Sequence, residues 1–105
     1  MSKMIEVDAN NFIAEVLDAP VPVLVDFSAA WCGPCRALKP VLEGMSAEAN
    51  GRFKVVVVDI DNSQELAIEH QIASVPTLLV YKNGQTVNRL VGLQSKENLF
   101  KALGQ

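Results

Sequence analysis

The sequence is poor in the side chains that most often bind metal ions. It contains two cysteines and one histidine in 105 residues, and the histidine, His70, is remote from the cysteines along the chain. A zinc site needs about four ligands, so one chain does not supply a complete set and we expect no bound metal. His70 falls on a short polar helix, where we expect its ring to be solvated.

The chain also lacks an excess of positive charge and a long hydrophobic run. Its net charge is -3 at pH 7, which favours neither nucleic acid nor an anionic membrane as a partner. No apolar run approaches the roughly 18 residues of a membrane span. Residues 1–4 do not have the features of a signal peptide, which favours the cytoplasm, or an organelle if a transit segment was removed. In such reducing surroundings a pair of cysteines is expected to be catalytic rather than structural.

Length and composition predict a single domain, residues 1–105. The residues are 50% hydrophobic and 20% charged, which is ordinary for a globular protein with a real core. The chain shows no repeats, linkers or low-complexity tracts, so nothing in the sequence marks a domain boundary.

Hydrophobic patterns predict an α/β protein. The apolar residues of 23–27 and 55–58 do not alternate with polar ones, which is typical of strands covered on both faces. Strands are predicted over residues 4–7, 23–28, 53–59, 77–81 and 86–91, with a hairpin turn at 83–84. Helices are predicted after a cap at Asp8 or Asn10, over 34–49, over 62–71, and from Ser95 onward. This order predicts a single mixed central β-sheet of about five strands, flanked by about four helices.

Both cysteines lie in the stretch Trp31-Cys32-Gly33-Pro34-Cys35, between a predicted strand and a predicted helix. Two thiols at this spacing and at such a junction are typical of redox chemistry. A disulfide between them closes a very short loop, so it constrains the unfolded chain little and adds little stability. The unpaired N–H groups of a first helical turn favour a thiolate, and Arg36 adds a positive charge. We therefore expect Cys32 to be the exposed, low-pKa nucleophile and Cys35 to be the resolving thiol beneath the helix.

Asp26 stands out because it interrupts an apolar strand just before the cysteine turn. A buried, unpaired carboxylate is costly, so burial is expected to raise the pKa of Asp26 toward neutral. One interpretation is a structural aspartate that holds N–H groups of a loop. The other, which we favour, is a proton acceptor for Cys35, because that thiol needs a base when it attacks a mixed disulfide.

Two further residues admit more than one interpretation. Trp31 either packs in the core or lies beside the active thiol as part of a docking surface. Pro76 begins a predicted strand, a position that requires no function, and nothing in the sequence alone predicts a cis bond before it.

Several short motifs together resemble the thioredoxin family, and the resemblance covers the whole chain. They are Val25-Asp26-Phe27, Ala30-Trp31-Cys32-Gly33-Pro34-Cys35, Pro40, Asp59-Ile60-Asp61, Val75-Pro76-Thr77-Leu78, Lys82-Asn83-Gly84 and Val91-Gly92. The form Trp-Cys-Gly-Pro-Cys is typical of the disulfide-reducing members. Oxidase and isomerase relatives usually carry other residues between the two cysteines.

The resemblance implies a thioredoxin fold, a docking surface and a recycling partner. Pro76 is expected to be cis and to lie against the cysteine pair, where the backbone of Val75 pairs with a bound substrate strand. A thioredoxin reductase is expected to return electrons to the oxidised pair, and the protein is expected to hold no cofactor of its own. The residues expected to form the docking surface are Trp31, Gly33, Pro34, Ile60, Val75, Pro76, Gly92 and Leu93.

Four positions depart from the common bacterial pattern of the family. Ser28 stands where a tryptophan is frequent, and Ser74 stands where glycine is usual. Leu93 replaces the usual alanine, which bears on the choice of partner. Val57 matters most, because a lysine at this position often neighbours the buried aspartate and stabilises its charged form. We therefore expect a higher pKa for Asp26, and slower resolution of the mixed disulfide below that pKa, than in relatives with the lysine.

The sequence thus predicts a thiol–disulfide oxidoreductase that reduces disulfides in target proteins. Cys32 attacks the target disulfide, Asp26 takes the proton of Cys35 directly or through a water, and Cys35 resolves the mixed disulfide. A monomer is expected, with disulfide-containing proteins and a thioredoxin reductase as partners. Two other classes stay open. One is a binding module that uses the docking surface in any redox state, and the other is a metal or cluster site that two chains share through their cysteines.

Overall fold

The structure, a computed structural model, describes residues 4–105. Residues 1–3, which belong to the segment interpreted above as lacking signal-peptide features, lie outside the described residues. The strands are β1 (Ile5–Glu6), β2 (Val23–Ser28), β3 (Lys54–Asp59), β4 (Thr77–Lys82) and β5 (Gln85–Val91). The helices are η1, a short π-helix (Ile13–Leu17), α1 (Gly33–Glu48), α2 (Gln64–Glu69) and α3 (Lys96–Leu103). Within the described residues these elements confirm the predicted α/β architecture.

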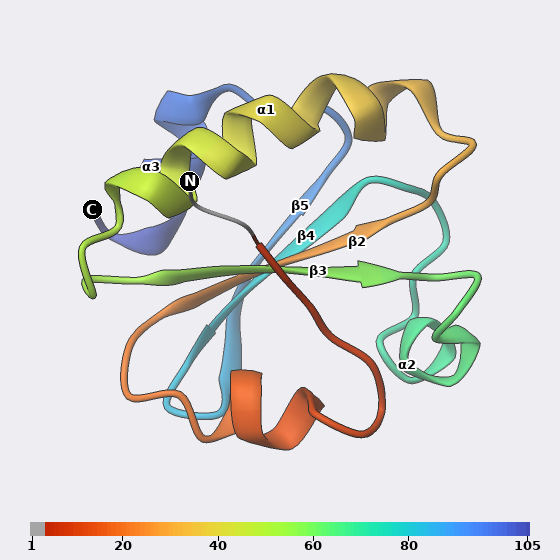
Figure 1. Ribbon diagram of the computed structural model, residues 1–105, viewed down its shortest axis with the longest axis horizontal. Helices are drawn as coiled ribbons and strands as arrows, with labels where there is room; N and C mark the ends of the chain where they lie inside the picture. Colours follow the sequence, from red (N-terminus) through yellow and green to blue (C-terminus); the bar gives the residue numbers. More distant parts are fainter. Residues whose placement is uncertain (1–3) are drawn as a thin grey trace.

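The strands form one mixed sheet in the order β1-β3-β2-β4-β5. β1, β3 and β2 run parallel, whereas β4 runs antiparallel to β2 and to β5. Helices α1 and α3 cover one face of the sheet, and η1 and α2 lie on the other (Figure 1). The parallel connections need crossover helices, and the helical segments that follow β1 and β2 supply them.

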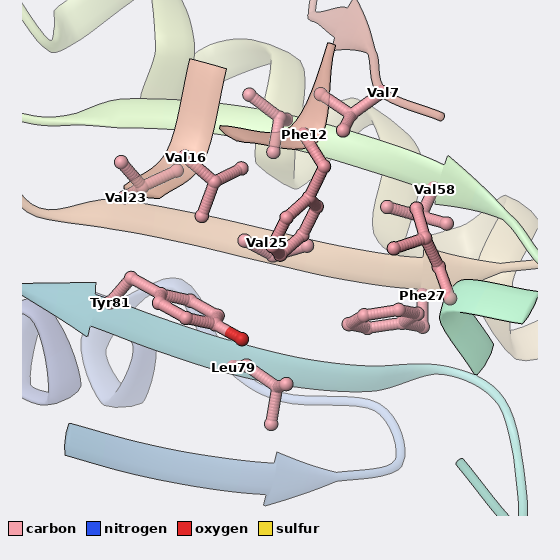
Figure 2. Close-up of a cluster of buried hydrophobic side chains, with 11 residues drawn as sticks. Val7, Phe12, Val16, Val23, Val25, Phe27, Val58, Leu79 and Tyr81 are labelled. Atoms are coloured by element: carbon pink, nitrogen blue, oxygen red, sulfur yellow. The ribbon is translucent and has the colours of Figure 1, made fainter. Parts of the chain in front are cut away.

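A hydrophobic core lies on each side of the sheet, because neighbouring residues of a strand point to opposite faces. On β2, Leu24 faces the core beneath α1 and α3. Val25 and Phe27 face the other core, which Phe12 and Tyr81 share (Figure 2). Leu24, Val25 and Phe27 are all fully buried, as predicted for a strand that is covered on both faces.

The hairpin and the last helix also confirm their sequence signals. Asn83 and Gly84 adopt positive φ angles of 53° and 77° between the antiparallel strands β4 and β5, as a two-residue hairpin turn requires. Ser95 caps α3, and its side chain accepts a hydrogen bond of 3.1 Å from the N–H of Asn98.

Asp8, one of the two predicted caps, caps the helical turn that leads into η1. Its carbonyl oxygen accepts a hydrogen bond of 3.0 Å from the N–H of Phe12, and its carboxylate accepts one of 2.8 Å from the N–H of Asn10. The N–H of Asp8 in turn donates to the side chain of Asn11. The cap thus satisfies N–H groups that have no partner within the helix. The π-helical segment η1 itself begins after Phe12, which makes no side-chain cap.

The prediction that the ring of His70 is solvated is wrong. Its ring lies between Phe12 and Phe27, with centroid distances of 5.1 and 5.3 Å. Nδ1 lies 2.7 Å from the carbonyl oxygen of Leu66, and Nε2 lies 2.7 Å from the hydroxyl oxygen of Tyr81. The histidine follows the last residue of α2, where its side chain turns toward the sheet and both ring nitrogens find partners.

Candidate active site

The residues expected at the site gather at one end of the sheet. The pairing register places Ser28, the last residue of β2, beside Asp59, the last residue of β3, so the two strands end at the same level. On the other side of β2, Thr77 begins β4 and pairs with Val91 at the end of β5. Four loops therefore meet at this end of the sheet, on the right in Figure 1. They are the loops after β2, β3 and β5 and the loop before β4.

Cys32 and Cys35 are joined by a disulfide with a Cα–Cα distance of 5.2 Å. Cys32 is the N-cap of α1 with extended backbone, and Pro34 follows in the first turn, which requires no N–H from it. The N–H of Cys35 donates a hydrogen bond of 3.2 Å to Sγ of Cys32. One of the unpaired N–H groups at the start of the helix therefore points at this sulfur, where it stabilises negative charge.

The prediction that Cys32 is exposed is wrong for this disulfide form. Its exposed fraction is 5%, against 3% for Cys35. Both cysteines pack with Ala29, and Ile60 and Val75 contact the same cluster. Sγ of Cys32 also lies 3.6 Å from the carbonyl oxygen of Val75. The backbone of Val75 therefore borders the sulfur of Cys32.

Asp26 lies on the face of β2 beneath α1 and is 3% exposed. Its neighbours across the sheet, Val57 and Leu78, are both apolar. Burial raises the pKa of Asp26 to about 7, which confirms the predicted direction and its cause. None of residues 4–105 donates a hydrogen bond to its carboxyl group, so the interpretation as a holder of loop N–H groups is wrong.

Asp26 and Cys35 line the same cavity, which has a volume of about 350 Å³. Such a volume holds several water molecules, and polar groups in its wall can bind them. Arg36 also lines the cavity, but its guanidinium donates a hydrogen bond of 2.9 Å to the carbonyl oxygen of Ala30. The cavity offers a path for a proton between the resolving thiol, the carboxyl group and solvent.

Trp31 is on the surface beside the disulfide, so the core-packing interpretation is wrong. Its side chain is 65% exposed, and its indole Nε1–H donates a hydrogen bond of 2.9 Å to the carboxylate of Asp61. This bond holds the ring against the loop that follows Ile60.

The Val75–Pro76 peptide bond is cis, as the resemblance implied. The carbonyl oxygen of Pro76 accepts a hydrogen bond of 2.8 Å from the N–H of Gly92, which ties the loop before β4 to the loop after β5. Leu93 follows and is 57% exposed. Two other residues of the expected surface, Gly33 and Pro34, are exposed in the first turn of α1.

Sequence reasoning missed the other charged residues of the cavity wall, which are Glu6, Lys39 and Asp59. For Lys39 a signal was present, because it lies four residues after Cys35 and so shares its helical face. For Glu6 no signal was available, since its place depends on the pairing of β1 with β3.

Neither a metal centre nor a membrane span is found among residues 4–105. No three side chains of the His, Cys, Asp and Glu types cluster there in a way that could hold a metal ion. No described helix is both long enough and apolar enough to cross a membrane.

The fold and the disulfide at the start of α1 define a dithiol–disulfide oxidoreductase. Comparison with known proteins agrees, because the thioredoxin family profile matches residues 3–105. The chain therefore belongs to the thioredoxin family. It uses the Cys32–Cys35 disulfide as its redox-active group, and the expected recognition is confirmed.

Individual relatives cover the chain to different extents. It is 44% identical over 103 residues to Thioredoxin 1 of Nostoc sp., across 98% of this chain and 96% of the relative. It is 43% identical over 99 residues to the bifunctional thioredoxin reductase/thioredoxin of Mycobacterium leprae. That match covers 94% of this chain but only 22% of the longer protein. A mitochondrial thioredoxin of Mus musculus is 44% identical over 92 residues, across 88% of this chain and 55% of the relative.

Proposed function

We propose that the chain reduces disulfides in other proteins, with Cys32 as the attacking thiolate, Cys35 as the resolving thiol and Asp26 as the proton acceptor. One observation supports these roles above all others. The sulfur of Cys32 accepts the N–H of Cys35 at the start of a helix, whereas Cys35 lines the cavity that reaches Asp26. The two sulfurs thus lie in different surroundings, one suited to a thiolate and the other to the loss of a proton.

The reaction proceeds in two exchanges. The Cys32 thiolate attacks one sulfur of the target disulfide, a mixed disulfide forms, and the other target sulfur leaves as a thiolate. The Cys35 thiol gives its proton to the Asp26 carboxylate and attacks Sγ of Cys32. The Cys32–Cys35 bond forms, and the second target sulfur leaves. The target gains two electrons and, from solvent, the protons of its two thiols, while the chain is oxidised to the disulfide.

The raised pKa of Asp26, about 7, suits this role. A base is most effective when its pKa lies near the working pH, because it is then ionised in part and still binds a proton well. After the transfer, the cavity gives the proton a route from Asp26 to solvent.

The docking surface comprises Trp31, Gly33, Pro34, Ile60, Val75, Pro76, Gly92 and Leu93. It suits an extended segment of the target. The carbonyl oxygen of Val75, close to Sγ of Cys32, lies where it can accept a backbone N–H of that segment. The exposed side chains of Trp31 and Leu93 offer apolar contacts to such a segment.

A thioredoxin reductase is the proposed source of electrons, and the relative that carries both names in Mycobacterium leprae supports this pairing. We further propose that residues 1–105 act as one domain and as a monomer, without membrane or nucleic-acid partners. The cytoplasm is the proposed compartment, and the mitochondrial relative keeps an organelle as the alternative.

Reduction of insulin tests the proposal, with dithiothreitol as the electron source and a catalytic amount of the chain. We expect faster precipitation of the reduced insulin chains with the native protein, and only the background rate with Cys32→Ser. A folded protein with free thiols that gives no acceleration contradicts the proposal and favours a binding module. Such a module would still bind its partner when both cysteines are replaced by serine.

A further inference from the structure

Three adjacent strands place Glu6, Val57 and Asp26 in one row. Glu6 of β1 pairs with Val57 of β3, and Val57 pairs with Asp26 of β2. Paired residues of parallel strands point to the same face of the sheet, so all three side chains face α1, as Leu24 does. The backbones at Glu6 and Asp26 are therefore two strand spacings apart, about 10 Å, with an uncharged valine between them.

Helix α1 covers this row with Cys35, Arg36 and Lys39, which all line the cavity above Asp26. The guanidinium of Arg36 is held by the carbonyl oxygen of Ala30. Lys39 lies one turn after Cys35 on the same helical face. Its ammonium group has no ion pair or hydrogen bond with any of residues 4–105.

The remaining charged groups of the cavity wall are acidic. The Asp59 carboxylate is engaged by its own turn, where it accepts a hydrogen bond of 2.9 Å from the N–H of Asp61. The Glu6 carboxylate has no such partner among the described residues. β4 contributes only apolar Leu78 beside Asp26. In the cavity wall, the cations Lys39 and Arg36 therefore favour an ionised Asp26 and the anions Glu6 and Asp59 oppose it, and of these four groups Lys39 and Glu6 are the ones that no hydrogen bond holds elsewhere.

We propose that Lys39 is a positioning residue for proton transfer, whose ammonium group stabilises the Asp26 carboxylate across the cavity and supplies the positive charge that β3 lacks at Val57. This inference rests on the role of Asp26 proposed above. Glu6 acts in the opposite direction and limits the effect. Helix α1 thus carries both the resolving thiol and a cation that favours the ionised form of its proton acceptor.

A two-step reaction with an aromatic disulfide, 5,5′-dithiobis(2-nitrobenzoate), isolates the step in question. Attack by Cys32 releases the first coloured thiolate, and resolution by Cys35 releases the second. The rate of the second release is measured from pH 5 to pH 9 for the native protein, for Lys39→Met and for Glu6→Gln. Lys101→Met on α3 removes the same charge from an exposed site outside the cavity and serves as the matched control.

We expect Lys39→Met to move the midpoint of the second-release profile upward by about half a pH unit, less than the shift of a direct ion pair because water screens the cavity. Well below the midpoint, this slows resolution roughly threefold at constant pH. Glu6→Gln is expected to move the midpoint downward, and Lys101→Met to leave it unchanged. Adding Val57→Lys to Lys39→Met is expected to move the midpoint back, because the cation then stands beside Asp26 on β3.

Asp26→Asn separates the failure of this inference from the failure of the proposed function. If Asp26→Asn slows the second release but Lys39→Met leaves the midpoint in place, the role of Lys39 is contradicted and that of Asp26 stands. If Asp26→Asn leaves the second release unchanged, the proposed acceptor is wrong. In the Asp26→Asn background, Lys39→Met should change nothing further, and a further loss there also contradicts an action through Asp26.

Discussion

The buried carboxyl group of Asp26 makes the stability of the folded protein depend on pH. Burial raises its pKa from 3.8 to about 7, so between these values the unfolded chain releases a proton that the folded chain keeps. Stability attributable to Asp26 is therefore complete below about pH 4 and is lost as pH rises through about 7. Replacement of Asp26 by asparagine, which has the same size and no charge, removes this dependence.

The size of the effect follows from the shift. The interval from 3.8 to about 7 is about 3 pH units, and one unit corresponds to about 1.4 kcal/mol. Asp26 is only 3% exposed, so ionised Asp26 lowers the free energy of unfolding by up to about 4 kcal/mol above pH 8, and by less where water in the cavity screens its charge. This is a large part of the roughly 5–15 kcal/mol that stabilises a typical domain.

Urea unfolding of the oxidised native protein and of oxidised Asp26→Asn, at intervals from pH 4 to pH 8.5, measures this effect. Other titrating groups contribute to both proteins, so the difference in the free energy of unfolding isolates Asp26. We expect the difference to shift by several kcal/mol in favour of Asp26→Asn as pH rises. The free-energy cost of burying the asparagine amide is the same at every pH, because the amide does not titrate, so it does not affect the change with pH. A difference that changes by less than about 1 kcal/mol across the range refutes the argument from burial.

Three further predictions concern the docking surface, the half-buried His70 and the last helix. Trp31→Ala should raise the KM for insulin while the free energy of unfolding changes by less than about 0.5 kcal/mol, because the ring is exposed; an unchanged KM contradicts its docking role. Tyr81→Phe removes the hydroxyl partner of His70 and should cost about 1–3 kcal/mol in urea unfolding, and a neutral result shows that water replaces the bond. Ser95→Ala should cost about 1 kcal/mol by the same measurement, whereas Ser95→Asn, which retains the cap, should not.

The local signals of the sequence were sufficient for the parts of the site that lie close together along the chain. The apolar run of β2 leads directly into the cysteine turn, so Asp26, Cys32 and Cys35 could be placed together from their spacing. The hairpin at Asn83 was equally local. The cis bond before Pro76 was expected only from the resemblance, since no local physical signal distinguishes the isomer.

The features that could not be predicted depend on contacts between distant elements. His70 is half-buried because Phe12 and Phe27, from two other parts of the chain, pack around its ring. Glu6 reaches the cavity because β1 pairs with β3 rather than with β2. Cys32 is covered because the loop before β4 returns beside it, with Val75 in contact. In each case the sequence predicts the element but not its neighbour.

The central claim is that Cys32 attacks target disulfides and Cys35 resolves the product, and trapping of the mixed disulfide tests it most directly. Reduced Cys35→Ser is incubated with a disulfide-bonded protein, and the products are separated without reductant and analysed by mass spectrometry. We expect a covalent complex joined through Cys32, which dithiothreitol dissolves, and no complex with Cys32→Ser. A stable complex through Cys35 in Cys32→Ser, with none through Cys32 in Cys35→Ser, contradicts the assignment of the two thiols.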